Sequence, residues 1–244
     1  MMDWQGKRYW IVGASEGLGR EVAKAVNRVG AEVIVSARSE DRLKELVAEL
    51  PGKGSYVTVD VTDIESVKAA AKEVGEIDGL VYLAGVYWPF GAEDWDNEKA
   101  TLMAEVNYIG ASRVVGEVIG PMVKRDAGHI VLTSSLTGFR GLPGSIGYTA
   151  SKAAVMSLAE CMYADLRKTG VKVQVVNPGF IETRLTDKND FHMPFKMQPE
   201  DAAREVLEHM GGDTFKKSFP LVFSWLFRLS QFLPDWAYYR IFGR

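Results

Sequence analysis

The stretch RYWIVGASEGLG, residues 8–19, decides the fold of this chain. Its first five residues, 8–12, form a short apolar run of the kind that becomes a buried strand. Gly13, Gly17 and Gly19 follow, and the sequence after them has a helical period. A strand that turns on glycines into a helix is the unit from which parallel α/β sheets are built.

The rest of the chain repeats this alternation. Five further strand-like runs occupy residues 32–36, 55–59, 79–83, 129–134 and 171–176. Helical segments alternate with them at residues 17–29, 41–50, 63–74, 97–124 and 148–168. The pattern predicts an α/β fold: a Rossmann-type doubly wound parallel sheet of about seven strands, with helices on both faces.

Composition narrows the class of protein. The chain has 244 residues, a formal net charge of −3, 47% hydrophobic and 25% charged residues, which is typical of a soluble globular protein. The balanced charge gives no sign of nucleic-acid binding. We expect one domain over residues 1–244, with an aromatic-rich extension at about 219–244. Residues 1–12 lack the apolar run of a secretory signal, and the expected location is cytoplasmic.

Cysteine and histidine suggest no further chemistry. The single cysteine, Cys161, excludes an intramolecular disulfide, and we expect it to be a small core residue rather than a nucleophile. His129, His192 and His209 lack the spacing of metal ligands, so no metal site is expected.

The glycine loop is a candidate phosphate site. Glycines permit a tight turn and a close approach of the backbone to a pyrophosphate, and the following helix N-terminus presents N–H groups to it. The spacing G-x-x-x-G-x-G differs from the more common G-x-G-x-x-G, and an ordinary glycine turn is the alternative. The position at the first strand–helix junction favours the dinucleotide interpretation.

The end of the second strand bears on the type of dinucleotide. An acidic residue there would bind a ribose 2′-hydroxyl and indicate NAD, but none occurs before Glu40. Arg38 instead offers a guanidinium to a 2′-phosphate, which favours NADP(H) over NAD. Ser15, Ser36 and Ser39 are candidate donors. Glu16 argues mildly against a nearby phosphate, and a solvated surface role for Arg38 is the alternative.

Four later positions predict a reaction centre. Tyr148 and Lys152 are four residues apart and share one face of a helix, where an ammonium would lower the pKa of the phenol. Ser135 follows a strand and can hydrogen-bond a carbonyl oxygen. Asn107 lies within a long helical segment, where it either supports a water-linked proton path to Lys152 or is a solvated amide. Each motif alone is weak, because a core tyrosine beside a lysine occurs in many helices.

From about residue 6 to residue 208 the chain resembles a short-chain dehydrogenase/reductase of the common short form. Asn107, Ser135, Tyr148 and Lys152 match the family's catalytic tetrad in order and spacing. The resemblance implies that Tyr148 exchanges the proton and Ser135 orients the carbonyl. Lys152 would lower the pKa of the tyrosine and hold the nicotinamide ribose, and Asn107 would seat a relay water.

The same resemblance covers the cofactor positions. Asp60-Val61 matches the adenine pair, and Asn177-Pro178-Gly179 with Thr183 matches the nicotinamide segment. The implied cofactor-binding residues are Gly13, Ser15, Gly17, Leu18, Gly19, Arg38, Asp60, Val61, Ala84, Gly85, Tyr148, Lys152, Pro178, Gly179, Ile181 and Thr183.

Two departures from the family pattern stand out. Val12 replaces the usual threonine before Gly13, and Tyr82-Leu83 replaces the Asn-Asn of the family's Asn-Asn-Ala-Gly. The loss of both amides means that other hydrogen bonds must support the loop around Ala84 and Gly85.

The loops after the fourth, fifth and sixth strands predict an apolar substrate. They hold Tyr87, Trp88, Pro89, Phe90, Phe139 and Leu142, and a stretch at 185–197 that reads as a mobile lid. That stretch contains Phe191, His192, Met193, Phe195 and Met197. We expect a hydrophobic ketone, aldehyde or alcohol, while packing beneath surface loops is the alternative for any single aromatic.

The end of the chain is rich in aromatic residues, with nine of the chain's 26 between residues 219 and 244. Two amphipathic helices at about 221–233 and 235–242 could close the substrate pocket, contact another subunit or lie on a bilayer. Burial on the protein or on a subunit of a homodimer or homotetramer ranks ahead of membrane contact. The membrane interpretation rests on Trp225, Trp236, Tyr238 and Tyr239 with Arg228, Arg240 and Arg244.

These features predict an NADP(H)-dependent oxidoreductase with Tyr148 as general acid and base. The alternative from another class is a cofactor-binding regulatory or scaffold protein of the same fold without catalysis, which would have no need of the tetrad. Epimerase or dehydratase chemistry on the same fold is a third interpretation. The substrate and the direction of reaction stay open.

Overall fold

The computed structural model describes residues 3–190 and 193–243, and it has the predicted doubly wound architecture. Seven parallel strands form one sheet in the order β3-β2-β1-β4-β5-β6-β7. The strands are β1 (Arg8–Val12), β2 (Glu32–Ala37), β3 (Gly54–Thr58), β4 (Gly79–Tyr82), β5 (Gly128–Thr133), β6 (Val171–Pro178) and β7 (Lys216–Phe219). The chain changes direction across the sheet between β1 and β4, which creates the crevice where such sheets bind ligands.

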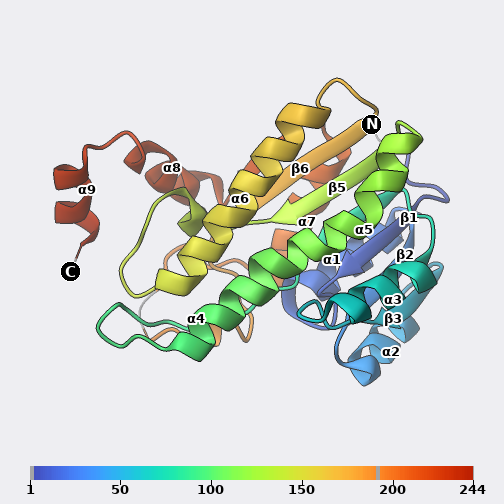
Figure 1. Cartoon of the computed structure of the whole chain (residues 1–244), viewed down its shortest axis with the longest axis horizontal. Helices are drawn as coiled ribbons and strands as arrows, with labels where there is room; N and C mark the ends of the chain where they lie inside the picture. The colour runs from blue at the N-terminus through green and yellow to red at the C-terminus, as the bar shows by residue number, and fades with distance from the viewer. Residues whose placement is uncertain (1–2, 191–192, 244) are drawn as a thin grey trace.

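Helices cover both faces of the sheet, as Figure 1 shows. The helices are α1 (Gly17–Arg28), α2 (Glu40–Glu49), α3 (Ile64–Val74), α4 (Asn97–Ala104), α5 (Gly110–Lys124), α6 (Ile146–Leu166), α7 (Pro199–Gly211), α8 (Leu221–Ser230) and α9 (Asp235–Phe242). One core lies between the sheet and α3, α5 and α6, and the other lies between the sheet and α1, α2 and α7. Successive side chains of β1 point to opposite faces of the sheet: Trp10 packs in the first core, and Tyr9 and Ile11 pack in the second.

The long predicted helix at 97–124 contains an irregularity. α4 and α5 are joined without a loop by a π-helical turn, Glu105–Ile109, which contains Asn107. Such single π turns inside α-helices are frequent at functional sites. The sequence pattern predicts the continuous helix but not this turn.

The sequence analysis predicts neither α7 nor β7, and its prediction for Cys161 is wrong. β7 begins with two lysines, whereas the predicted strands are apolar runs. Lys216 pairs with Glu160, and Lys217 pairs with both Glu205 and Glu208. Cys161 is exposed rather than part of the core, because the outer face of α6 carries it to solvent.

The last two helices extend from the body beside the C-terminal ends of β5 and β6, in red in Figure 1. Arg140 attaches them: its guanidinium donates to the carbonyls of Ser230 and Leu233 and pairs with Asp235. The same guanidinium stacks on the ring of Tyr238, whose hydroxyl donates to the Gly141 carbonyl at 2.8 Å. No helix among the described residues is long and apolar enough to cross a membrane.

Candidate active site

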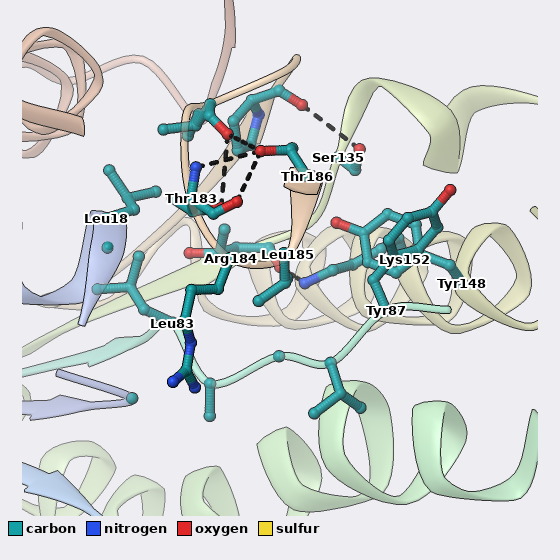
Figure 2. A pocket seen from close by; sticks show the side chains of 18 of the residues that line it. Leu18, Leu83, Tyr87, Ser135, Tyr148, Lys152, Thr183, Arg184, Leu185 and Thr186 are labelled. Atoms are coloured by element: carbon teal, nitrogen blue, oxygen red, sulfur yellow. Dashed lines mark hydrogen bonds between the residues drawn. The ribbon is translucent and has the colours of Figure 1, made fainter. Parts of the chain in front are cut away.

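A cavity of about 1490 Å³ opens at the C-terminal edge of the sheet. Every predicted cofactor position lines it, as do Ser135, Tyr148 and Lys152 of the predicted tetrad. Figure 2 shows Tyr148, Lys152 and Ser135 in this pocket together with Leu18 and the segment that carries Thr183 and Arg184. Residues more than 130 positions apart in the sequence therefore meet in one hollow.

The glycine loop has the geometry that a pyrophosphate requires. At Gly13 the φ angle is +92°, and a Cβ there would lie 2.3 Å from the Ala84 backbone nitrogen. A Cβ on Gly19 would lie 2.1 Å from the Gly13 carbonyl oxygen, and one on Gly17 would lie 2.9 Å from the Thr183 side chain. Side chains at these positions would clash with neighbouring backbone or with Thr183, so glycine allows the tight turn at the N-terminus of α1, where a dinucleotide phosphate fits.

The far end of the cavity is basic. Arg38, Ser39 and Arg42 line it, opposite Asp60 and Val61. Burial works against ionisation of Asp60, but hydrogen bonds from Thr62 and the charge of Arg38 hold the pKa of its carboxyl below the usual value. The exposed Arg38 therefore lies beside the position expected for an adenosine.

Two predictions about this end of the cavity need revision. Ser36 is wrong as a phosphate donor, because its side chain is fully buried and its hydroxyl accepts a hydrogen bond from the Trp10 indole at 2.8 Å. Glu16 opposes a phosphate less than predicted, because its carboxylate pairs with Arg42 at 2.7 Å and with Arg184 at 2.8 Å. The local charge balance around Glu16 is therefore positive.

Tyr148, Ser135 and Lys152 converge where β5 meets α6. Lys152 is buried, donates to the Thr133 carbonyl at 2.9 Å and lies 5.6 Å from the centre of the Tyr148 ring. The Ser135 hydroxyl donates to the Pro178 carbonyl at 3.4 Å. The first turn of α6 and the last residues of β5 thus bring a phenol, an ammonium and a hydroxyl to one place.

The pKa of Tyr148 shifts in the direction opposite to the one predicted. Burial raises the pKa of the phenol to about 12, although hydrogen bonding with Ser135 lowers it. Burial also lowers the pKa of the Lys152 ammonium to about 8. This ammonium therefore loses its proton more readily than an exposed lysine does. Desolvation is the largest cause of the shift in the pKa of Tyr148, and the protein alone keeps this phenol neutral at pH 7.

Asn107 is buried in the π turn, so the solvated-amide alternative is wrong. Its Oδ1 accepts from the Val86 N–H at 2.8 Å, and its Nδ2 donates to the Val86 carbonyl and to Ser151 Oγ. A Cβ on Gly85 would lie 3.5 Å from Asn107 Oδ1 and 3.7 Å from Lys152 Nζ. Asn107 therefore faces Lys152 across Gly85 and also supports the loop after β4.

Tyr82 and Leu83 replace the family's two asparagines by a different set of contacts. The Tyr82 hydroxyl donates to the Val106 carbonyl in the π turn at 2.6 Å. The Leu83 N–H donates to the Val12 carbonyl at 2.8 Å, and its side chain packs on the second core. The loop around Ala84 and Gly85 is thus held by Tyr82 and Asn107, both through the π turn.

The substrate side is partly as predicted. Tyr87, Trp88, Pro89, Leu142 and Leu185 line the cavity. Phe90, Phe139, Met193, Phe195 and Met197 do not, because they pack on residues beside it: Phe90 contacts Trp95, Phe139 lies beneath Lys216, and Met197 pairs with Ile181. Phe191 and His192 lie outside the described residues.

Three contacts join the 186–190 segment to the reaction centre. The Tyr87 ring meets the Tyr148 ring edge-on, with centres 4.9 Å apart, and its hydroxyl donates to Asn189 Oδ1 at 2.9 Å. Lys188 donates to the Tyr87 carbonyl. On the other side of the cavity, Thr183 and Thr186 donate to the Ile181 carbonyl.

Several residues that line the cavity were not predicted as part of the site, and two of them come from the aromatic end of the chain. Phe223 and Phe227 reach the cavity from α8. The aromatic surplus at the end of the chain was the available signal, and it left pocket closure among three alternatives. In the structure, the inner face of α8 lines the cavity, as the closure alternative requires.

Comparisons with known proteins agree with this geometry. A family model described as short chain dehydrogenase matches residues 7–193. An uncharacterized oxidoreductase of Myxococcus xanthus is 35% identical over 232 residues, which are 92% of each chain. A crystal structure of a variant actinorhodin polyketide ketoreductase with NADPH has a TM-score of 0.81 and 25% identity, and covers 90% of this chain and 97% of its own. The structure of a short chain dehydrogenase/reductase from Burkholderia phymatum with NAD has a TM-score of 0.85 and 24% identity, over 94% of both chains, which shows the shared fold.

Proposed function

This chain belongs to the short-chain dehydrogenase/reductase family of NAD(P)-dependent oxidoreductases, which act on CH–OH or C=O groups, and we propose that it uses NADP(H) on an apolar carbonyl compound or alcohol with Tyr148 as acid and base. The observation that carries this proposal is the meeting of Tyr148, Ser135 and Lys152 in the cavity that the glycine loop also lines. A protein that only bound the dinucleotide would have no use for this arrangement beside it.

The proposed mechanism follows from the position of the hydroxyls. The bound nicotinamide would supply or accept the hydride. Ser135 and Tyr148 would both donate hydrogen bonds to the carbonyl oxygen, where negative charge develops as hydride arrives. The neutral phenol of Tyr148 is the form that can give its proton to that oxygen.

Lys152 and Asn107 would support the proton transfer. Lys152 would hold the nicotinamide ribose, and its charge would favour the phenolate left after Tyr148 gives up its proton. Asn107 fixes the Val86 backbone and faces Lys152 across Gly85, the place for a relay water. These roles rest on the family resemblance together with the contacts described above.

The preference for NADP(H) is supported by charge. Arg38 and Arg42 line the adenosine end of the cavity, and the acidic residue nearby, Asp60, lies after β3 rather than at the end of β2, where a 2′-hydroxyl would be read. A 2′-phosphate would find two guanidinium groups there. The apolar substrate is supported by the lining residues Trp88, Leu142 and Phe223.

The role of Tyr148 is tested by Tyr148→Phe, which removes the hydroxyl and keeps the ring. We expect turnover to fall by at least about a hundredfold, since general acid–base groups contribute about 10²–10⁴ in rate. NADPH binding, followed by its fluorescence, should persist. The assay is NADPH consumption against ketones and aldehydes graded by chain length and aromaticity. Full activity in the variant would sink the mechanism, and tight NADPH binding without turnover of any compound would favour the scaffold alternative.

Cofactor choice is tested by Arg38→Gln. We expect the Kd for NADPH to rise about 10- to 100-fold, because a charged hydrogen bond contributes about 1.5–3 kcal/mol. The Kd for NADH should change little. Arg204→Gln is a matched control, since Arg204 pairs with Asp201 on α7 and does not line the cavity. An equal loss for NADPH and NADH would contradict the 2′-phosphate assignment.

A further inference from the structure

Helix α8 has two apolar faces. Its inner face buries Phe223 and reaches the cavity through Phe223 and Phe227. Phe223 also contacts Phe180 and Phe195 at the rim of the substrate side. This face alone would account for pocket closure.

No part of the chain within residues 3–190 and 193–243 covers the outer face. Apart from Arg228, its exposed side chains are large and apolar, each between 46 and 72% exposed: Leu221, Val222, Trp225, Leu226 and Leu229. Their spacing places them along one stripe of the helix. A soluble protein rarely exposes such a stripe without a partner.

The exposed apolar surface continues past α8. Phe232 in the turn is 84% exposed, and Trp236, Tyr239 and Ile241 of α9 are 56 to 74% exposed. Arg140 and Tyr238 hold α9 in place, so these side chains belong to an ordered element. In Figure 1, α8 and α9 project together from one end of the molecule.

The charges of this element fit an anionic, amphipathic partner. Arg228 lies over the Trp225 ring at 4.6 Å, and Arg240 lies on the exposed side of α9. The acidic side chain of the two helices, Asp235, is paired with Arg140. Arginines beside tryptophan and tyrosine are the combination that favours the boundary between water and lipid.

We propose that α8 and α9, with the turn between them, lie on an anionic lipid bilayer, and that the cavity behind α8 takes its substrate from that bilayer. The second half of this statement rests on the proposed function, because it makes the substrate a lipophilic carbonyl compound or alcohol. Phe223 and Phe227 line the cavity on the inner side of the helix whose outer side contacts lipid, so an apolar molecule passes a continuous apolar surface.

A second copy of the chain is the competing occupant. Two features favour lipid over it. Trp225 and Tyr239 each carry one polar atom and lie near an arginine, Arg228 and Arg140 respectively, which suits a wet apolar boundary better than a dry interface. The stripe also belongs to a helix that closes the pocket, and a subunit seated there would give no route for an apolar substrate.

The test compares two double variants of the full chain. Val222→Gln with Leu229→Gln removes two outward side chains that do not line the cavity. Ile64→Gln with Val123→Gln, on α3 and α5, removes two exposed aliphatic side chains elsewhere. Co-sedimentation is measured with phosphatidylcholine vesicles, with and without phosphatidylserine.

We expect the unmodified chain to sediment with vesicles, more strongly with phosphatidylserine, and the emission of its tryptophans to shift to the blue. Val222→Gln with Leu229→Gln should lower the partition coefficient by at least about tenfold, because binding scales with buried apolar area. The control should bind like the unmodified chain.

Three results would overturn the proposal: no vesicle binding by the unmodified chain, equal losses in both double variants, or a dimer that only Val222→Gln with Leu229→Gln dissociates. NADPH binding is measured on all three proteins. If it persists while vesicle binding fails, the membrane inference fails alone. If NADPH binding is absent from the unmodified chain, the proposed function fails instead.

Discussion

Tyr82 replaces a polar amide with a buried phenol, and its hydroxyl sets the position of Asn107. The hydroxyl donates to the Val106 carbonyl, which belongs to the π turn that carries Asn107. Gly110 makes room for it, because a Cβ there would lie 2.6 Å from the Tyr82 oxygen. A π turn widens the spacing of the backbone hydrogen bonds, and Tyr82 supplies a donor to one of its carbonyls.

Tyr82→Phe should therefore destabilise the chain by about 1–3 kcal/mol, because it leaves the buried Val106 carbonyl without this donor. The measurement is the free energy of unfolding in urea. Tyr56→Phe is the control: its hydroxyl donates to Glu40 at the surface, and its loss should cost less than about 0.5 kcal/mol. Equal stability of Tyr82→Phe and the unmodified chain would show that Asn107 alone holds the π turn.

At the residue scale, spacing along the chain predicts position well and environment poorly. The cofactor positions that the family resemblance implies all line the cavity. The sequence does not show that the Ser36 hydroxyl is unavailable to a phosphate, because its hydrogen-bond partner, Trp10, lies on the neighbouring strand. The pKa of Tyr148 was predicted in the wrong direction, because burial has no counterpart in a tyrosine–lysine spacing.

At the scale of elements, one guanidinium joins the last two helices to the body. Arg140 receives the end of α8 through the Ser230 carbonyl and the start of α9 through Asp235. It stacks on the Tyr238 ring with 4.0 Å between the Cζ atom and the ring centre. Such a residue should determine how firmly α9 is held, with little effect on the sheet.

Arg140→Gln should raise the amide hydrogen exchange of residues 231–243 by about tenfold or more, since charged hydrogen bonds contribute about 1.5–3 kcal/mol. Exchange in β1, β4 and β5 should not change. Arg125→Gln is a suitable control, because Arg125 makes a similar set of bonds to Ile77, Ala127 and Glu76 at the opposite end of the sheet. Unchanged exchange in α9 would mean that Tyr238 holds the helix without Arg140.

Elements with a strong hydrophobic period were predictable, and the others were not. Strands β1 to β6 fall within two residues of their predicted bounds, because each is an apolar run. The predicted helix at 148–168 begins at Ile146 in the structure. β7 escaped prediction because its lysines look like a surface loop, and only its position beside β6 makes it a strand.

At the scale of the whole molecule, a buried polar network spans the sheet on the side away from the cavity. His129 contacts the Tyr9 hydroxyl at 2.9 Å and Gln174 Oε1 at 2.8 Å. Gln174 Nε2 donates to the carbonyls of His209 and Thr214. Burial lowers the pKa of His129 to about 3 and that of His209 to about 4.

This network predicts that acid weakens the fold well before the carboxylates titrate. Both imidazoles stay neutral in the folded chain but bind protons near pH 6.5 when unfolded. The unfolded state therefore binds more protons below that pH, and stability falls as pH drops from about 6.5 toward 4. The loss should reach about 2 kcal/mol for each histidine by pH 5, measured by urea unfolding at several pH values. His209→Gln should reduce the slope, and a flat profile between pH 7 and 5 would contradict the burial of both histidines.

The two outer strands of the sheet have a consequence for how the chain meets its own copies. β3 and β7 are only five and four residues long. β7 opens with Lys216 and Lys217, which are engaged by glutamates on α6 and α7. A short edge strand with charged residues is a poor template for a strand of another chain, so the chain resists forming an intermolecular β-sheet. Growth of the sheet from molecule to molecule, the usual first step of fibrous aggregation, is thereby discouraged at the edge where the sheet ends.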